Sequence, residues 1–393
     1  CGSEGTLAFI TEARLDITPL PKVRRLVNVK YDSFDSALRN APFMVDARAL
    51  SVETVDSKVL NLAREDIVWH SVKELITDVP DKTLLGLNIV EFAGDDLELI
   101  TSQVSSLCAR LDELMAKGEG GVIGWQRCDD LAGIERIYAM RKKAVGLLGN
   151  AKGAAKPIPF AEDTCVPPDH LADYIVEFRA LLDSHGLSYG MFGHVDAGVL
   201  HVRPALDMCD PQQEILMKSI SDDVVALTAK YGGLLWGEHG KGFRAEYSPA
   251  FFGEELYAEL RKVKAAFDPE NRLNPGKICP PEGIDAPMRQ VDDVKRGHFD
   301  RQIPISVRTS WRGAMECNGN GLCFNFDAKS PMCPSMKISG NRIHSPKGRA
   351  TLVREWLRLL ADRGVDPIKL EKELPERRAS LRTLIERNRN SWH

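Results

Sequence analysis

Two histidines and a nearby Glu-His pair are the residues whose types and spacing best suit metal chemistry. The segment GHVDAGVLH places His194 and His201 seven positions apart, around a short Asp-Ala-Gly turn. A two-residue turn at Ala197 and Gly198 would set the two histidines opposite each other on paired strands, with Cβ atoms about 5 Å apart. Two imidazoles at that separation can bind one divalent ion.

A second segment, WGEHGKG, supplies Glu238 and His239 within a glycine-rich stretch that follows a helical pattern. Two histidines and one carboxylate are a common ligand set for a catalytic metal that keeps one coordination position open. The alternative is that each histidine is a hydrogen-bonded structural residue, which is the commoner case for a single histidine. The combination of a histidine pair with a Glu-His pair favours a metal site.

Three of the nine cysteines are clustered: Cys317, Cys323 and Cys333, the last followed by Pro334. Clustering of this kind favours metal or iron–sulfur chemistry over a disulfide framework. The intervals of five and nine residues differ from the ferredoxin run Cys-x2-Cys-x2-Cys-x3-Cys-Pro, and a 4Fe-4S cluster normally has four thiolates. A zinc site and three plain thiols are therefore alternatives to a cluster.

The elements that must position these residues follow from hydrophobic periodicity. The pattern predicts strands over 24–32, 47–56, 84–94, 121–128, 188–194 and 199–204, and helices over 33–41, 95–116, 131–148, 170–184, 211–231 and 253–267. Strand–helix–strand units predict an antiparallel or mixed sheet with helices on one face, and two such units in succession predict a ferredoxin-like α+β fold. After a charged, Pro- and Gly-containing stretch over 280–312, helices are expected over 347–363 and 369–390, so the cysteine-containing segment should be mostly helical.

Composition excludes several classes of function. The chain has 393 residues, 52 basic and 56 acidic, 43% hydrophobic and 27% charged, which is ordinary for a globular protein of two or three domains. The slightly acidic balance argues against nucleic acid as a partner. No apolar run approaches the roughly 18 residues that a transmembrane helix needs. The first residues contain no initiator Met and no targeting peptide, which predicts an internal fragment of a longer protein.

Three motifs in order resemble one family. GHVDAGVLH, GEHGKG and FDPENRLNPGKI resemble the C-terminal half of FAD-linked oxidases of the D-2-hydroxyacid dehydrogenase family. The opening CGSEGTLAFITEARLDITPLP resembles the end of that family's FAD-binding domain, and the cysteine-containing region resembles the iron–sulfur part fused behind it in large bacterial members. The resemblance implies four parts: a tail of the FAD-binding domain (1–22), the substrate or cap domain (23–279), a linker (280–312) and the start of an iron–sulfur domain (313–393).

The resemblance also implies an activity, namely the FAD-dependent oxidation of a D-2-hydroxy acid to the 2-oxo acid. D-2-hydroxyglutarate is the first expectation for the substrate, followed by D-lactate and glycolate. His194, His201 and Glu238 correspond to the ligands of a divalent metal, zinc or manganese, and His239 corresponds to the general base. Such a metal lowers the pKa of the bound hydroxyl, the base takes its proton, and the hydride passes to the flavin.

Three cations are candidates for binding substrate carboxylates. Arg141 corresponds to a family arginine that grips a carboxylate, although its RKK triplet could equally form a solvated helix face. Lys156 lies at the exit of a Gly/Ala/Lys-rich loop. Arg203 stands where an Asn commonly follows the second histidine, and it either contacts a carboxylate or points away. An arginine fork and a lysine point charge would suit a dicarboxylate.

The remaining expectations concern cofactors, partners and location. Gly2, Ser3, Gly5 and Thr6 resemble the turn that contacts FAD in the family. The partner is a small-molecule 2-hydroxy acid, and the resemblance leaves the electron acceptor unnamed and a homo-oligomer open. The expected location is the cytoplasm, with a peripheral membrane position of the longer protein as an alternative. A rival function is a non-catalytic electron-transfer or assembly module with a structural zinc site, which would be closed to substrate.

Overall fold

The computed structural model describes residues 2–369, apart from 150–152, 318, 320, 322, 329 and 331. The chain divides into two compact units. The first consists of Cys1–Leu206 and Ile215–Asp293, and the second of Asp207–Glu214 and Val294–His393. Beyond Lys369, the helix predicted over 369–390 lies outside the described residues.

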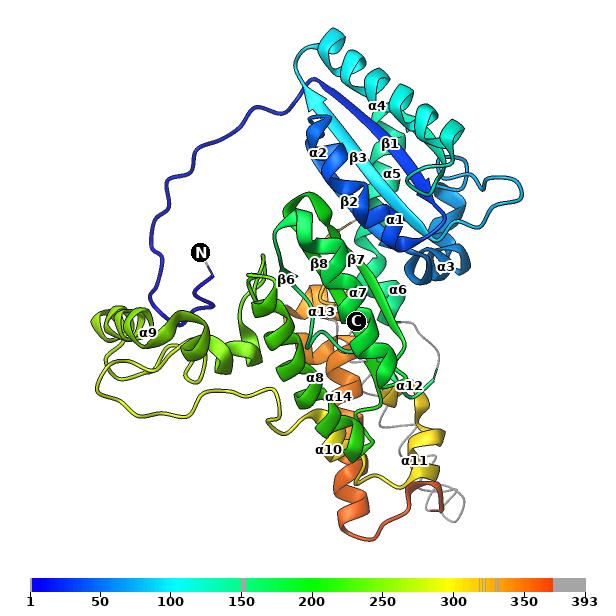
Figure 1. Cartoon of the computed structure of the whole chain (residues 1–393). Helices are drawn as coiled ribbons and strands as arrows, with labels where there is room; N and C mark the ends of the chain where they lie inside the picture. The colour runs from blue at the N-terminus through cyan, green and yellow to red at the C-terminus, as the bar shows by residue number, and fades with distance from the viewer. Residues whose placement is uncertain are drawn as a thin grey trace. The chain divides into compact units, whose positions relative to one another are not determined.

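Within the described residues, the first unit is built on a sheet of eight strands in which every pairing is antiparallel (Figure 1). The strands are β1 (Val23–Tyr31), β2 (Ser51–Asp56), β3 (Gly86–Gly94), β4 (Val122–Cys128), β5 (Lys156–Pro157), β6 (Thr164–Cys165), β7 (Tyr189–His194) and β8 (Val199–Leu206). Their order is β4-β1-β3-β2-β7-β8-β5, with β6 paired to β8. The order β4-β1-β3-β2 is that of a ferredoxin-like unit, and the predicted α+β class is confirmed.

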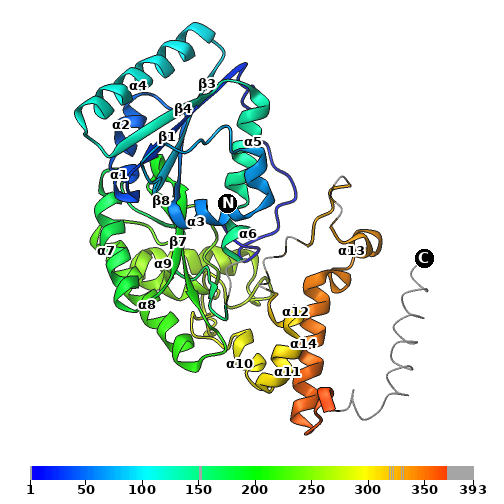
Figure 2. The same ribbon diagram turned by 90° about the vertical axis from the view of Figure 1, so that its right-hand side faces the viewer.

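Helices cover both faces of this sheet, so the expectation of helices on one face is wrong. The helices are α1 (Phe34–Arg39), α2 (Ala41–Asp46), α3 (Ser57–Glu65), α4 (Leu97–Lys117), α5 (Leu131–Lys142), α6 (Ala144–Gly149), α7 (Leu171–Ser184), α8 (Pro211–Lys230) and α9 (Ser248–Phe267). Figure 2 shows α1, α2 and α4 on one side of β1 and β3, and α3 and α5 on the other. The reason is that β1 and β3 are buried on both faces, so each face needs a cover.

Aspartate side chains begin several of these helices, as expected from the capping preference of short acceptors. Asp56 accepts a hydrogen bond from the Val59 N–H at the start of α3, and Asp130 accepts one from the Gly133 N–H in α5. Helix α3 was not predicted, because the extended pattern of β2 ends at Asp56 and α3 begins at the next residue. It places Asp56 at the junction of strand and helix.

The core that supports the candidate site lies between the sheet and helices α3, α5 and α6. Leu26, Leu87 and Ile89 of the strands pack in one cluster with Ile134 and Ile137 of α5. Burial of these side chains fixes α5 over one face of the sheet. The polar end of α5 is thereby held above the strands that carry the histidines.

The second unit is mostly helical in its described residues, as predicted. It contains α10 (Arg296–Asp300), α11 (Ile305–Ser310), α12 (Arg312–Met315), α13 (Pro334–Ser339) and α14 (Pro346–Asp362). Ile303, Val307 and Leu357 form its buried cluster, which explains why the stretch predicted as a linker contains α10 and α11. Among the described residues of the whole chain, no helix has the length and apolar character needed to cross a bilayer.

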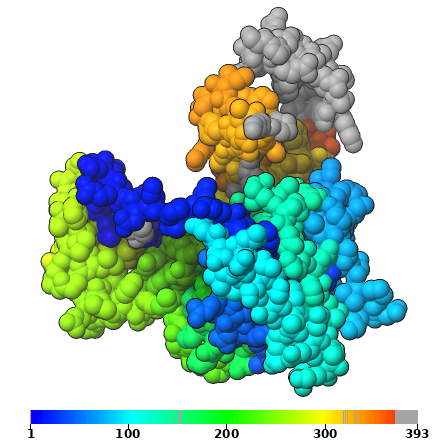
Figure 3. All heavy atoms as spheres, turned by 90° about the horizontal axis from the view of Figure 1, so that it is seen from above, coloured from blue at the N-terminus to red at the C-terminus, as the bar shows by residue number. Residues whose placement is uncertain are grey.

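The N-terminal residues of the first unit lie on its surface. Figure 3 shows this segment, in blue, beside the yellow-green residues of α9. The contact is polar: the Lys264 ammonium of α9 donates a hydrogen bond to the Thr6 carbonyl at 2.6 Å. Further along, Phe9, Ile17 and Leu20 are largely exposed.

Candidate active site

The candidate site lies on one face of the sheet, because successive residues of a strand point to opposite faces. Glu53 on β2 pairs with His194 on β7, and Phe192 on β7 pairs with His201 on β8. These side chains therefore share a face with Arg203, two residues after His201. They line a cavity of about 330 Å³ together with Tyr138, Arg141, Lys142 and His239.

The histidine hairpin differs from the expected one. Residues Val195–Ala197 form a 3-10 turn and Gly198 follows with φ 68°, so four residues rather than two connect the strands. His194 consequently pairs with Val199, and the expectation that the two histidines sit directly opposite is wrong. Their rings are diagonal neighbours, with centroids 5.7 Å apart. Gly198 is required here, since a Cβ would lie 1.8 Å from the Val166 carbonyl oxygen.

Glu238 brings the two histidines together. Its Oε1 lies 3.2 Å from His194 Nε2 and 3.0 Å from His201 Nε2. Ligands bound about 2.1 Å from one tetrahedral ion are separated from each other by about 3.4 Å, close to these spacings. The donor set of two imidazoles and a carboxylate therefore fits a divalent metal in composition, and one Glu238 oxygen lies near a nitrogen of each histidine.

The protonation state of His201 also suits a metal. Burial, together with the nearby His239 and Arg141, lowers the pKa of His201 to about 3, so its ring is neutral at physiological pH. The Nδ1 atom of His201 is buried without a hydrogen-bond partner. His194 differs, because its hydrogen bond to Glu53 raises its pKa. A neutral imidazole has the lone pair that a metal ion requires.

Asp163, which the sequence interpretation missed, binds the backbone of Glu238 and His239. Its Oδ1 accepts a hydrogen bond from the Glu238 N–H at 3.0 Å, and its Oδ2 accepts one from the His239 N–H at 2.9 Å. Its carbonyl accepts a third, from the Gly237 N–H at 2.8 Å. The residue is fully buried, with φ 69°. One carboxylate thus fixes the backbone of both proposed functional residues.

Asp163 could itself be counted as a metal donor. Ligand atoms of Asp163, His201, Glu238 and His239 all lie within 4.8 Å of one another. However, both carboxylate oxygens of Asp163 already accept backbone N–H groups, whereas His194 Nε2 lies 3.2 Å from Glu238. The group of mutually close ligand atoms does not include His194, which approaches the group through Glu238.

The His239 ring faces the cavity, and the acids near its two nitrogens lie beyond hydrogen-bond distance. The ring stacks on His201 with centroids 4.9 Å apart and an interplanar angle of 10°. Its Nε2 lies 3.9 Å from Glu238 Oε1, and its Nδ1 lies 3.7 Å from Glu162 Oε1. The side chain is 44% exposed. This position leaves a ring nitrogen accessible to a molecule in the cavity.

Two of the three predicted cations line the cavity, and each is paired with an acid. Arg141 binds Glu53 Oε2 through Nη2 at 2.8 Å and through Nε at 2.9 Å. Its guanidinium also lies over the Phe192 ring, 4.6 Å from the centroid. Arg203 Nε donates to Glu162 Oε2 at 2.6 Å. Lys156, on β5, is absent from the described residues that line the cavity.

Glu53 is a second residue that sequence reasoning missed. Burial disfavours its charged form, but the hydrogen bond from His194 and the charge of Arg141 lower its pKa. Its only sequence signal is a charge inside the β-branched run SVETVD. For Asp163 the signal is weaker still, an acidic residue in a Pro-punctuated segment. Their partners are distant in sequence, so neither role follows from local pattern.

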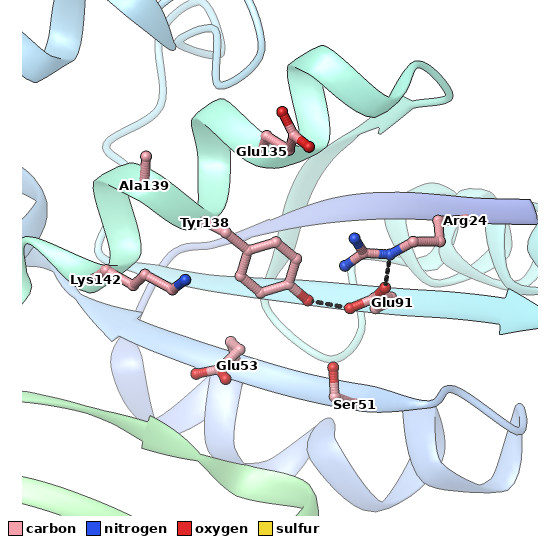
Figure 4. A pocket seen from close by; sticks show the side chains of 8 residues that line it. All are labelled: Arg24, Ser51, Glu53, Glu91, Glu135, Tyr138, Ala139 and Lys142. Atoms are coloured by element: carbon pink, nitrogen blue, oxygen red, sulfur yellow. Dashed lines mark hydrogen bonds and ion pairs between the residues drawn. The ribbon is translucent and has the colours of Figure 1, made fainter. Parts of the chain in front are cut away.

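A second hollow, of about 530 Å³, adjoins the first, because Glu53, Tyr138 and Lys142 line both. Figure 4 shows its side chains on strands of the sheet and on α5. Arg24 Nε binds Glu91 at 2.6 Å, and the Tyr138 hydroxyl donates a hydrogen bond to the same carboxylate. Glu91 is thus held from two sides.

The predicted flavin turn is bound to the loop that follows His239. The Thr6 N–H donates to the Ser3 carbonyl at 2.8 Å, and Gly2 and Gly5 have positive φ. The Glu4 carboxylate accepts hydrogen bonds from the N–H groups of Lys241 and Gly242. Hydrogen bonds therefore hold the turn against the loop that follows Glu238 and His239.

The cysteine trio lies in the second unit. Cys333 is buried, while Cys317 and Cys323 are partly exposed. Within the described part of that unit, the three thiols do not form a group of converging donors like that around Glu238.

Comparisons with known proteins found relatives that match the whole chain. The chain is 88% identical over 392 residues to "D-2-hydroxyglutarate dehydrogenase" of Escherichia coli (strain K12), which covers 100% of this chain and 38% of that protein. It is 79% identical over 393 residues to the protein of the same name from Pantoea ananatis (strain AJ13355), again covering 100% of the chain and 38% of the relative.

A more distant relative is "D-lactate dehydrogenase" of Anaerostipes hadrus, 27% identical over 285 residues, covering 71% of this chain and 57% of that protein. The chain spans about 38% of the length of the first two relatives. The family model described as "FAD linked oxidases, C-terminal domain" matches residues 20–278, which is more than half of the chain, and the chain therefore belongs to this family.

Proposed function

We propose that this chain is the substrate-binding part of an FAD-dependent dehydrogenase that oxidises D-2-hydroxyglutarate to the 2-oxo acid. The observation that carries the proposal is the approach of Glu238 to His194 and His201, two histidines that line one cavity with Arg141. Relatives named for this activity, 88% and 79% identical, support the choice of substrate over D-lactate and glycolate.

We infer that this chain contributes residues that would hold a metal and contact a flavin. His194, His201 and Glu238 would hold a divalent ion, zinc or manganese, and Gly2, Ser3, Gly5 and Thr6 would contact FAD. When bound, the metal supplies positive charge that lowers the pKa of the substrate hydroxyl, and FAD accepts the hydride.

His239 is the proposed general base. Its ring faces the cavity and is not hydrogen-bonded to Glu238, so it can accept the hydroxyl proton. The stacking on His201 holds the ring in place, and Asp163 holds its backbone. A base fixed in this way loses little orientational freedom when the substrate binds.

The substrate carboxylates are proposed to bind Arg141 and Arg203, with Lys156 as a third candidate. Glu53 and Glu162 orient the two arginines but use only part of their donors, because a guanidinium has five N–H groups. Support for Lys156 is weaker, since it does not line the cavity among the described residues.

The cysteine trio is proposed to take part in electron transfer from the flavin, as ligands of a 4Fe-4S cluster. Support comes from the Cys-Pro ending at Cys333 and Pro334, which matches the ferredoxin pattern. The iron content of the full-length protein, measured under anaerobic conditions, tests this role.

The activity is tested with the full-length protein and an artificial electron acceptor. D-2-hydroxyglutarate should be oxidised with a higher kcat/KM than L-2-hydroxyglutarate, D-lactate or glycolate. A chelator should abolish turnover, and added zinc or manganese should restore it. Full activity in protein shown by elemental analysis to be metal-free would refute the metal assignment. A preference for D-lactate or glycolate would refute the substrate.

A further inference from the structure

Glu53 contacts both His194, the proposed metal ligand, and Arg141, the proposed partner of a substrate carboxylate. We propose that Glu53 is a positioning residue that holds His194 and Arg141 in one fixed arrangement. The inference rests on the proposed function, because it assigns His194 to a metal and Arg141 to a substrate carboxylate.

The backbone places Glu53 where it can contact both residues. Strand β2 pairs with β7 so that Glu53 and His194 are directly opposite, and side chains of such a pair lie on the same face. Arg141 approaches from the end of α5, which the core cluster fixes over that face. The Glu53 side chain is only 12% exposed, so water competes little for its oxygens.

The two oxygens of Glu53 have different partners. Oε1 lies 2.8 Å from His194 Nδ1, and Oε2 lies 2.8 Å from Arg141 Nη2 and 2.9 Å from Arg141 Nε. A carboxylate accepts hydrogen bonds but does not donate them, so the proton of a neutral His194 resides on Nδ1. The lone pair is then on Nε2, the nitrogen that faces Glu238. A carboxylate behind a metal-binding histidine commonly sets its tautomer in this way.

The same carboxylate sets the direction of Arg141. Two of the five guanidinium N–H groups bind Glu53, while the face of the guanidinium lies on Phe192. Three N–H groups are left for a substrate carboxylate. Glu53 therefore fixes the separation between the site of the hydroxyl and the site of a carboxylate, which is the distance that a 2-hydroxy diacid must match.

Glutamine cannot replace this carboxylate. An amide has one accepting oxygen and one donating NH₂ group, so the NH₂ of Glu53→Gln would face a donor on either His194 or Arg141. Aspartate keeps the charge but is one methylene shorter, so it cannot reach both partners. Both variants should therefore weaken the contact with His194 and the contact with Arg141 together.

The test measures the affinity of the full-length protein for Zn²⁺, by competition with a chromophoric chelator, alongside KM and kcat for D-2-hydroxyglutarate. Glu53→Gln should weaken zinc binding about 10- to 100-fold, the usual cost of losing such a partner, and should also raise KM. Arg141→Ala should raise KM but leave zinc affinity within a few-fold of wild type. Glu135→Gln, which removes a carboxylate from the adjoining hollow, is the matched control and should change neither.

The possible results distinguish a failure of the role of Glu53 from a failure of the proposed function. If wild-type protein binds zinc and Glu53→Gln binds it equally well, the role of Glu53 is refuted while the proposed function stands. If wild-type protein neither binds zinc nor oxidises D-2-hydroxyglutarate, the proposed function fails and the role of Glu53 fails with it. Should Glu53→Gln not fold, Glu53→Asp takes its place, and unchanged zinc affinity and KM in that variant would overturn the proposal.

Discussion

Asp163 anchors the loop that carries Glu238 and His239, and replacing it should loosen both residues at once. Asp163→Asn is nearly isosteric, but its amide oxygen can accept only one of the two backbone N–H groups that the carboxylate binds at 3.0 and 2.9 Å. The amide NH₂ would face the other N–H. Because Asp163 is fully buried, water cannot replace the lost partner.

The expected cost follows from these two bonds. A buried N–H left without a partner costs roughly 1–3 kcal/mol, and changing the remaining bond from charged to neutral costs about 1 kcal/mol more. If the loop must be restored to this conformation to bind metal, roughly 2–4 kcal/mol corresponds to an affinity lower by about 30-fold to several hundred-fold. Chelator competition measures the affinity, and hydrogen exchange of the peptide containing Glu238 and His239 measures the loosening of the loop.

Asp169→Asn provides the control, since Asp169 is exposed nearby in the chain and should leave both measurements unchanged. The reasoning is refuted if Asp163→Asn folds, retains wild-type metal affinity and shows wild-type exchange of the Glu238–His239 peptide. Weaker binding without faster exchange would mean that Asp163 acts on the metal directly rather than through the loop.

Three further predictions concern other residues. His239→Ala should lower kcat about 10²–10⁴-fold with metal content unchanged, and loss of the metal instead would make His239 a ligand. Arg141→Ala should raise KM more than it lowers kcat; an unchanged KM for D-2-hydroxyglutarate would exclude it from substrate binding. Burial raises the pKa of Asp56 to about 6, so its contribution to stability is present below pH 4 and is lost as pH rises through 6. In the wild-type protein the free energy of unfolding should therefore fall between pH 4 and pH 6, and in Asp56→Asn this fall should be smaller by about 3 kcal/mol. Urea unfolding at several pH values measures both, and an equal pH dependence in the two proteins would contradict the prediction.

The strands were predictable because their local patterns are strong. The alternation predicted over 24–32 corresponds to β1 (Val23–Tyr31), and the run over 121–128 corresponds to β4 (Val122–Cys128). The placement of helices on both faces was not predictable, because the alternation of β1 indicates one exposed face, whereas its polar residues Asn28 and Lys30 are buried as well.

The site was predictable where its residues lie in a short motif. His194 and His201 share one hairpin, so even the wrong turn length left them on the same face and close together. The contacts of Glu53 with His194 and of Asp163 with Glu238 join segments far apart in the chain. Such contacts depend on strand register and loop packing, which a single sequence does not specify.

The cations around the two hollows share one arrangement. Arg141 is paired with Glu53, Arg203 with Glu162 and Arg24 with Glu91, and in each pair the acid is largely buried. A free arginine would need to be ordered when a carboxylate arrives, at a cost in side-chain entropy. Here the acids hold the guanidinium groups in the folded protein, so a carboxylate of the proposed substrate would meet donors whose directions are already fixed. Selection among 2-hydroxy acids should then depend on whether a second carboxylate reaches those directions rather than on net charge, which favours a diacid of fixed length over D-lactate or glycolate.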